Sequence, residues 1–179
     1  MNALTARTDD GTYGVSIDAD LMKEIDQLCS TAGNVETGGI LIGQYTTDRT
    51  TALVLEATPP PIDSVRGHSW FVRGLSGLRE LLHRRWHSKT PMYYVGEWHF
   101  HPTATVEPSS VDLDQMARIA YAHEYSCKEP VLLILGQPEG ECGIRPVRAF
   151  VFPEGESAME LHPETGTPTL GQINHRPEP

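Results

Sequence analysis

Two histidines, His99 and His101, stand two positions apart in residues 92–101, a run that the sequence predicts to be a β-strand. Side chains two positions apart on a strand project from the same face, so both imidazoles can reach one metal ion. Asp112 offers a third, anionic oxygen. Two histidines and one carboxylate leave the fourth position of a tetrahedral site open to water, as in catalytic zinc sites. The pattern therefore predicts a zinc ion held by His99, His101 and Asp112.

The segment from Ser109 to Asp112 has a second interpretation. A Ser-x-x-Asp sequence ahead of an apolar run is first of all a helix capping box, and Val111, Met116 and Ile119 supply the apolar positions of the helix that would follow. The two interpretations are compatible. The N-terminus of a helix would hold Asp112 rigidly, with Ser109 at the cap.

Glu36 precedes an apolar run over residues 39–45. A glutamate that is not itself a ligand can act as the base for water at a zinc site, as it does in His-Glu-x-x-His peptidases. Glu36 is far from His99 along the chain, so only the fold can bring it there, for example at the entry to a strand beside the ligand strand. Taken alone, Glu36 is typical of a solvated loop carboxylate.

These elements together resemble the JAMM motif of the JAB/MPN domain family, over roughly residues 13–152. The matching positions are Glu36, His99, His101, Pro102, Ser109 and Asp112. The resemblance implies a zinc isopeptidase that removes ubiquitin-like proteins. It also implies that Glu36 is the catalytic base and that Ser109 donates a hydrogen bond to the developing oxyanion. The implied fold is α/β (α+β), with a mixed, mainly antiparallel sheet sandwiched by helices, as in cytidine deaminase-like folds.

Within the family, the sequences of residues 36–43 and 96–102 most resemble those of the bacterial JAB peptidases of antiphage operons, notably CBASS. That branch implies cleavage after the C-terminal tail of a ubiquitin-like modifier or of a conjugated cyclic-nucleotide synthase (a nucleotidyltransferase). Neighbouring activating and conjugating enzymes would be its pathway partners. Alternatives are a housekeeping peptidase that trims a sulfur-carrier protein and a non-catalytic MPN scaffold. A zinc nucleobase deaminase is excluded because the chain lacks the Pro-Cys-x-x-Cys sequence that supplies zinc ligands in those enzymes.

Bulk composition narrows the class of protein. The chain has 179 residues, enough for one domain with a sizeable core. Its formal net charge of −10 argues against nucleic acid as a partner, because that binding depends on phosphate neutralisation. No apolar run approaches the length of a membrane span, and the three cysteines form no Cys-x-x-Cys pair. A reducing cytoplasm is the simplest location.

The order of patterns predicts a strand, a helix, a hairpin, a helix, a strand, a helix and a second hairpin, which together make a mixed sheet covered by helices. The expected ranges are 13–17, 18–32, 39–45 with 51–57, 75–88, 92–101, 109–126 and 131–135 with 144–152. Residues 1–152 are therefore assigned to the JAB/MPN domain. Residues 153–179, rich in Pro and Glu, are expected to form an irregular C-terminal tail.

Three other carboxylates leave alternatives open. Glu97 lies one strand position before His99 and could contact it, although packing or surface exposure is the expected role. Glu107 and Asp114 flank the site and could replace the assigned carboxylates. Residues 57–74 form either an ordinary crossover loop or, as the resemblance implies, an insertion that holds the substrate's extended tail as an added strand.

Overall fold

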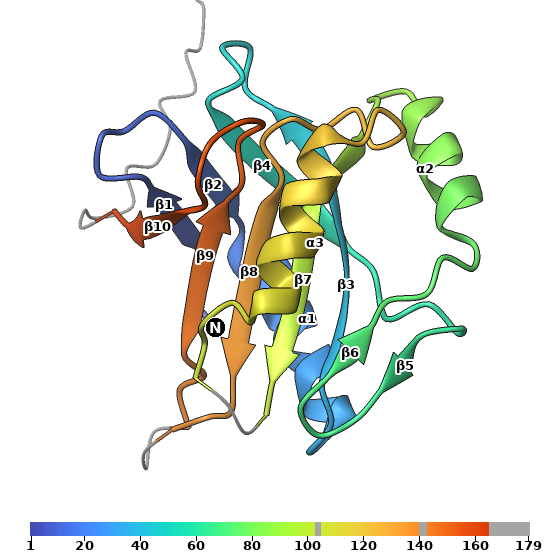
Figure 1. Ribbon diagram of the computed structural model, residues 1–179, viewed down its shortest axis with the longest axis vertical. Helices are drawn as coiled ribbons and strands as arrows, with labels where there is room; N and C mark the ends of the chain where they lie inside the picture. The colour runs from blue at the N-terminus through green and yellow to red at the C-terminus, as the bar shows by residue number, and fades with distance from the viewer. Residues whose placement is uncertain (103–104, 140–142, 165–179) are drawn as a thin grey trace, which may run out of the picture.

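The computed structural model of the protein describes residues 1–102, 105–139 and 143–164. Its main sheet has eight strands in the order β1-β10-β9-β8-β7-β3-β4-β2, and β1 pairs with both β2 and β10, so the sheet closes on itself (Figure 1). The strands are β1 (Leu4–Arg7), β2 (Gly14–Ile17), β3 (Thr37–Tyr45), β4 (Thr51–Ala57), β7 (Tyr93–His101), β8 (Val131–Gly136), β9 (Val147–Val151) and β10 (Met159–Pro163).

The sheet is mixed and mainly antiparallel, as expected. Only the β2–β4 and β7–β8 pairs are parallel. The expected hairpin forms between β3 and β4, and its polar turn is held by Asp48, whose carboxylate accepts a hydrogen bond from the Thr46 hydroxyl at 2.6 Å. The strand of the two histidines, β7, lies between β3 and β8, so it is a central strand with neighbours on both sides.

Alternation along the central strands divides their side chains between two apolar clusters, because successive residues of a strand face opposite sides. Leu41, Trp98 and Leu133 belong to one cluster, together with the buried face of α1 (Ala19–Ala32). Asp18 caps α1 and accepts a hydrogen bond from the backbone N–H of Leu21 at 2.8 Å, as the sequence predicts.

The opposite face of the sheet is covered by α3 (Ser110–Tyr121), which crosses over β7 and β8 in Figure 1. Met116 and Ile119 of α3 pack there against strand residues such as Ile40 and Ile134, and Leu78 of α2 (Leu78–Trp86) joins the same cluster. His99 and His101 alternate with the buried Trp98 and Phe100 of the first cluster, so the histidines lie on the α3 side.

The structure corrects two expectations. The layered sandwich is instead a closed sheet, because β1 and β10, neither of which was predicted, pair with each other. The irregular tail expected from Pro153 onward is wrong for residues 159–163, because β10 pairs with β9 and with β1. Residues 165–179 lie outside the described part. Sequence reasoning missed both strands because they are short and depend on distant partners.

Residues 57–74 contain a separate two-stranded hairpin of β5 (Val65–Arg66) and β6 (Phe71–Val72). It lies beside the lower end of β3 in Figure 1. Cys29 and Cys127 are free and buried, and Cys142 lies outside the described residues. Among the described residues, no helix combines the length and the apolar character needed to cross a membrane.

Candidate metal centre

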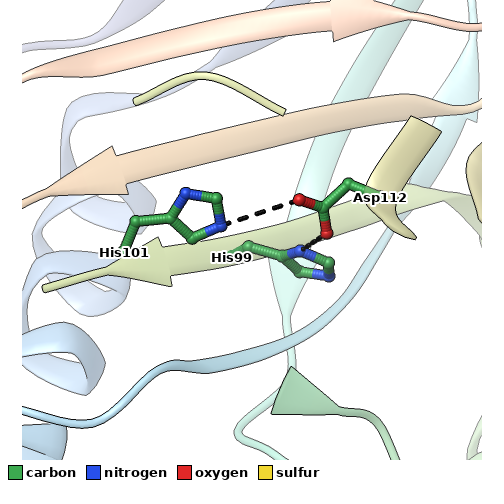
Figure 2. A group of neighbouring side chains, drawn as sticks. All are labelled: His99, His101 and Asp112. Atoms are coloured by element: carbon green, nitrogen blue, oxygen red, sulfur yellow. Dashed lines mark hydrogen bonds and ion pairs between the residues drawn. The ribbon is translucent and has the colours of Figure 1, made fainter. Parts of the chain in front are cut away.

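His99, His101 and Asp112 form a buried cluster between β7 and the first turn of α3. One possible ligand atom from each residue lies within 4.8 Å of the other two. The His99 Nδ1 atom is 2.8 Å from Asp112 Oδ1, and His101 Nε2 is 3.8 Å from Asp112 Oδ2 (Figure 2). Each of the three residues is 5–7% exposed. The strand period and the helix start thus bring together the three residues that the sequence singled out.

Asp112 is fixed by the capping box at the start of α3. Ser109 accepts a hydrogen bond from the Asp112 backbone N–H at 3.2 Å. In return, Asp112 Oδ2 accepts hydrogen bonds from the Ser109 backbone N–H at 2.8 Å and from its hydroxyl at 2.7 Å. The box satisfies backbone donors that a helix start leaves unpaired, and it leaves Oδ1 directed at His99.

The surroundings of the cluster shift the pKa values of the two histidines in opposite directions. Burial alone would lower the pKa of His99, but its hydrogen bonds to Asp112 and Glu97 raise it to about 9. Burial lowers the pKa of His101. Burial works against the ionised form of Asp112, yet its hydrogen bonds with His99 and Ser109 hold its pKa below the usual range. A metal ion entering the cluster therefore meets an ionised carboxylate and must displace a proton from His99.

Glu36 directly precedes β3, which runs antiparallel to β7 with Thr37 opposite Phe100 and Gly38 opposite His99. Its backbone N–H donates to the carbonyl of Gly67 at 2.8 Å. Burial and the negative charge of Asp112 raise the pKa of Glu36, and the charge of His99 partly opposes them. The fold thus brings Glu36 into electrostatic contact with the cluster, and a raised pKa makes a carboxylate a better base near neutral pH.

Comparison with protein families matches residues 18–151 to the family described as prokaryotic homologs of the JAB domain. The chain belongs to this family. The match covers the His99–His101–Asp112 cluster, Glu36 and the helices α1, α2 and α3.

Two individual comparisons with this JAB domain are informative, one with a sequence relative and one with a solved structure. A protein named CD-NTase/cGAS isopeptidase from Enterobacter hormaechei subsp. hoffmannii (strain UCI 50) is 44% identical over 159 residues, which cover 88% of this chain and 86% of the relative. The solution structure of a protein from Desulfitobacterium hafniense aligns with a TM-score of 0.54 at 19% identity, over 79% of this chain and 86% of the other. The second likeness concerns the fold alone.

Glu107 and Asp114, the two carboxylates that flank the His99–His101–Asp112 cluster in sequence, form ion pairs with arginines and do not join the cluster. Glu107 pairs with Arg148, and Asp114 pairs with Arg118 at 2.6 Å one helical turn away. Among the described residues, neither joins a group of possible metal ligands. Both are therefore poor substitutes for Asp112 and Glu36.

Sequence reasoning missed the environment of Glu97. Packing or surface exposure is the role expected for Glu97, with contact to His99 as the open alternative, but the structure shows it 0% exposed and ionically paired with Arg73 at 2.9 Å. Its Oε2 atom lies 3.3 Å from His99 Nε2. The available signal was its spacing, because a residue two positions before His99 shares the same face of β7. Arg73 had no local signal, because its partner is distant in the sequence.

The donor set of this JAB domain fits zinc. Two imidazoles and one carboxylate are ligands that zinc accepts in catalytic sites, and three protein ligands leave a position for water or substrate. Their backbones belong to a central strand and to a capped helix start. His99, His101 and Asp112 would hold the ion.

Proposed function

We propose that this JAB domain is a zinc-dependent JAMM isopeptidase. In this proposal it cleaves the amide bond after the C-terminal tail of a conjugated protein. The observation that carries the proposal is the placement of Glu36, a partly buried carboxylate with a raised pKa, beside the buried His99–His101–Asp112 cluster. A metal-binding scaffold without catalysis has no need for such a carboxylate.

Glu36, the two histidines and Asp112 have different roles in the proposed amide hydrolysis. When bound, zinc supplies the Lewis acidity that polarises the scissile carbonyl and acidifies the attacking water. Glu36 accepts the proton of that water and delivers it to the departing amine. Asp112 keeps its charge and its orientation through the capping box with Ser109. Burial of His99 and His101 keeps bulk water from competing for their ring nitrogens.

Ser109 is exposed at the helix start, so a substrate can reach it, and its role as an oxyanion donor remains a prediction. A hydroxyl has a single proton, and that of Ser109 is directed at Asp112 Oδ2 at 2.7 Å. Donation to an oxyanion therefore requires the hydroxyl to turn away from Asp112 during the reaction.

Replacement of Ser109 by alanine should slow turnover and also weaken the helix cap. Loss of one oxyanion donor costs on the order of 3 kcal/mol, or about 100-fold in rate. Loss of the cap costs about 1 kcal/mol of folding stability. Rate and melting temperature should be measured together, with the neighbouring exposed Ser110→Ala as the control. A lowered melting temperature with an unchanged rate would leave Ser109 as a cap only.

The surface beside the cluster suits an extended substrate. A groove of about 470 Å³ runs between β6 and α3, with Val72, Val111 and Gln115 among its lining residues. Val72 and Val111 are 58% and 66% exposed. The β5–β6 hairpin offers backbone groups to an added strand, a mode in which main-chain hydrogen bonds give affinity. A flexible C-terminal tail fits such a groove better than a folded segment does.

The name of the Enterobacter relative favours one substrate among those that the sequence left open. That relative is called a CD-NTase/cGAS isopeptidase, and 44% identity over most of both chains makes a related substrate the best choice here. We therefore place a conjugated nucleotidyltransferase first and a ubiquitin-like modifier second. Neighbouring activating and conjugating enzymes would make the bond that this protein cuts.

The substrate is tested by incubating the purified protein with such a conjugate and locating the cut by mass spectrometry. We expect cleavage directly after the last residue of the conjugated tail, and much slower cleavage with Glu36→Gln. A sulfur-carrier precursor serves as the competing substrate and unfolded casein as the general one. Cleavage of casein without preference for the conjugate would contradict deconjugation, and preference for the carrier would favour the housekeeping role.

A further inference from the structure

Glu97 is a fully buried carboxylate whose oxygens are all engaged. Its Oε1 atom accepts a hydrogen bond from Arg73 Nε at 3.0 Å and from the Tyr94 hydroxyl at 3.4 Å. Its Oε2 atom accepts from Gln115 Nε2 at 3.1 Å and lies 3.3 Å from His99 Nε2. A buried charge is costly unless it is paired and hydrogen-bonded, and Glu97 has both kinds of partner. This network reaches from the sheet to α3 and ends on the His99 ring.

The two nitrogens of His99 therefore face two different carboxylates. Nδ1 faces Asp112 at 2.8 Å, on the side where His101 also lies, and Nε2 faces Glu97. A histidine that binds a metal through one ring nitrogen commonly donates the N–H of the other to a carboxylate, which fixes the tautomer and the ring orientation. Glu97 has the position of such a carboxylate.

Arg73 extends this contact to the hairpin. It follows β6 directly, and its side chain is only 5% exposed. It also donates to the Tyr125 hydroxyl at 3.1 Å. Phe71, two residues earlier, packs edge-on against the His99 ring with 5.8 Å between ring centroids. The short segment 71–73 thus touches His99 through Phe71 and Glu97 through Arg73.

Gly38 on β3 makes room for this packing. A Cβ added there would lie 2.9 Å from both the His99 ring and the Phe71 ring, and 2.4 Å from the Trp98 carbonyl oxygen. These distances are shorter than Cβ contacts normally allow. The end of the hairpin is therefore seated directly against the ligand strand.

We propose that Glu97 is a positioning residue of the metal centre, holding the Nε2 edge of His99, and that Arg73 fixes Glu97 and so links the hairpin end to metal affinity. The inference rests on the proposed zinc site. It adds that two residues outside the cluster set how tightly zinc binds. Loss of such a carboxylate typically costs 10- to 100-fold in metal affinity.

The test uses zinc alone, with its dissociation constant measured by competition with a chelator of known affinity. We expect Glu97→Gln to weaken zinc binding about 10- to 100-fold and to change the visible absorption of the cobalt(II)-substituted protein. Glu56→Gln is the matched control, because Glu56 pairs with Arg85 on the opposite side of β3 and touches no ligand. Its zinc affinity should equal that of the wild type.

A second variant distinguishes a purely structural role of the Glu97–Arg73 pair from a role in zinc affinity. Glu97→Gln leaves Arg73 charged and buried without its ionic partner, so it lowers stability by itself. The double variant Arg73→Gln with Glu97→Gln removes both charges and should recover much of the urea stability of the metal-free protein. We expect its zinc affinity to remain weakened, because the carboxylate on His99 is still missing. Recovery of wild-type zinc affinity together with stability would overturn the inference.

The remaining outcomes separate this inference from the proposed function. A wild-type protein that binds no zinc overturns both. A wild-type protein that binds zinc, with Glu97→Gln showing the same affinity and the same cobalt spectrum, overturns the positioning role alone. In a mutant cycle, Arg73→Gln should weaken zinc binding in the wild-type background and have little further effect once Glu97 is glutamine.

Discussion

Replacing Glu36 with glutamine is expected to reduce amide-bond cleavage by about 10²- to 10⁴-fold while leaving the fold and the zinc content unchanged. The amide keeps the size of the side chain but cannot accept the proton of the attacking water. Glu36 is not one of the three clustered ligands, so the metal should stay bound. Single-turnover rates on a conjugated substrate, measured beside zinc content and melting temperature, provide the check. Glu36→Ala should behave in the same way.

Glu107→Gln is the control for this experiment. Glu107 also flanks the site, but it is paired with Arg148 and has no place in the cluster. Its loss should leave the cleavage rate close to that of the wild type. A wild-type rate for Glu36→Gln would show that Glu36 is not the base, and a large loss in Glu107→Gln would transfer that role to Glu107.

Replacing His101 with alanine should abolish stoichiometric zinc binding and, with it, all cleavage. The wild-type protein, purified without added metal, is expected to contain about one zinc per chain, held by three protein ligands. Removing one of three ligands leaves His99 and Asp112, which already hydrogen-bond each other at 2.8 Å and would remain paired without a metal. Elemental analysis of both proteins measures the difference.

The matched control is His123→Ala, because His123 is exposed and lies outside the cluster. Its zinc content should equal that of the wild type. An unchanged zinc content in His101→Ala would contradict the assigned ligands. Zinc would then be bound by other residues, and the proposed mechanism would lose its basis.

Local sequence rules determined the parts of the site that depend on one element. The strand period of two places His99 and His101 on one face, opposite Trp98 and Phe100, and the structure agrees. The Ser-x-x-Asp pattern predicts the capping box that the structure shows for Ser109 and Asp112. The hairpin of β3 and β4 and the capped start of α1 follow from turn and cap residues in the same way. Each of these features rests on interactions among residues close in the chain.

Only the tertiary structure decided how these parts meet. The register of β3 against β7 brings Glu36 toward the cluster, and no spacing in the chain encodes that register. The pairing of β1 with β10, which closes the sheet, joins segments from opposite ends of the described chain. The burial of Glu97 against Arg73 is equally non-local. Strand pairing and buried ion pairs gain their energy from partners far apart in sequence, so local sequence patterns do not predict them.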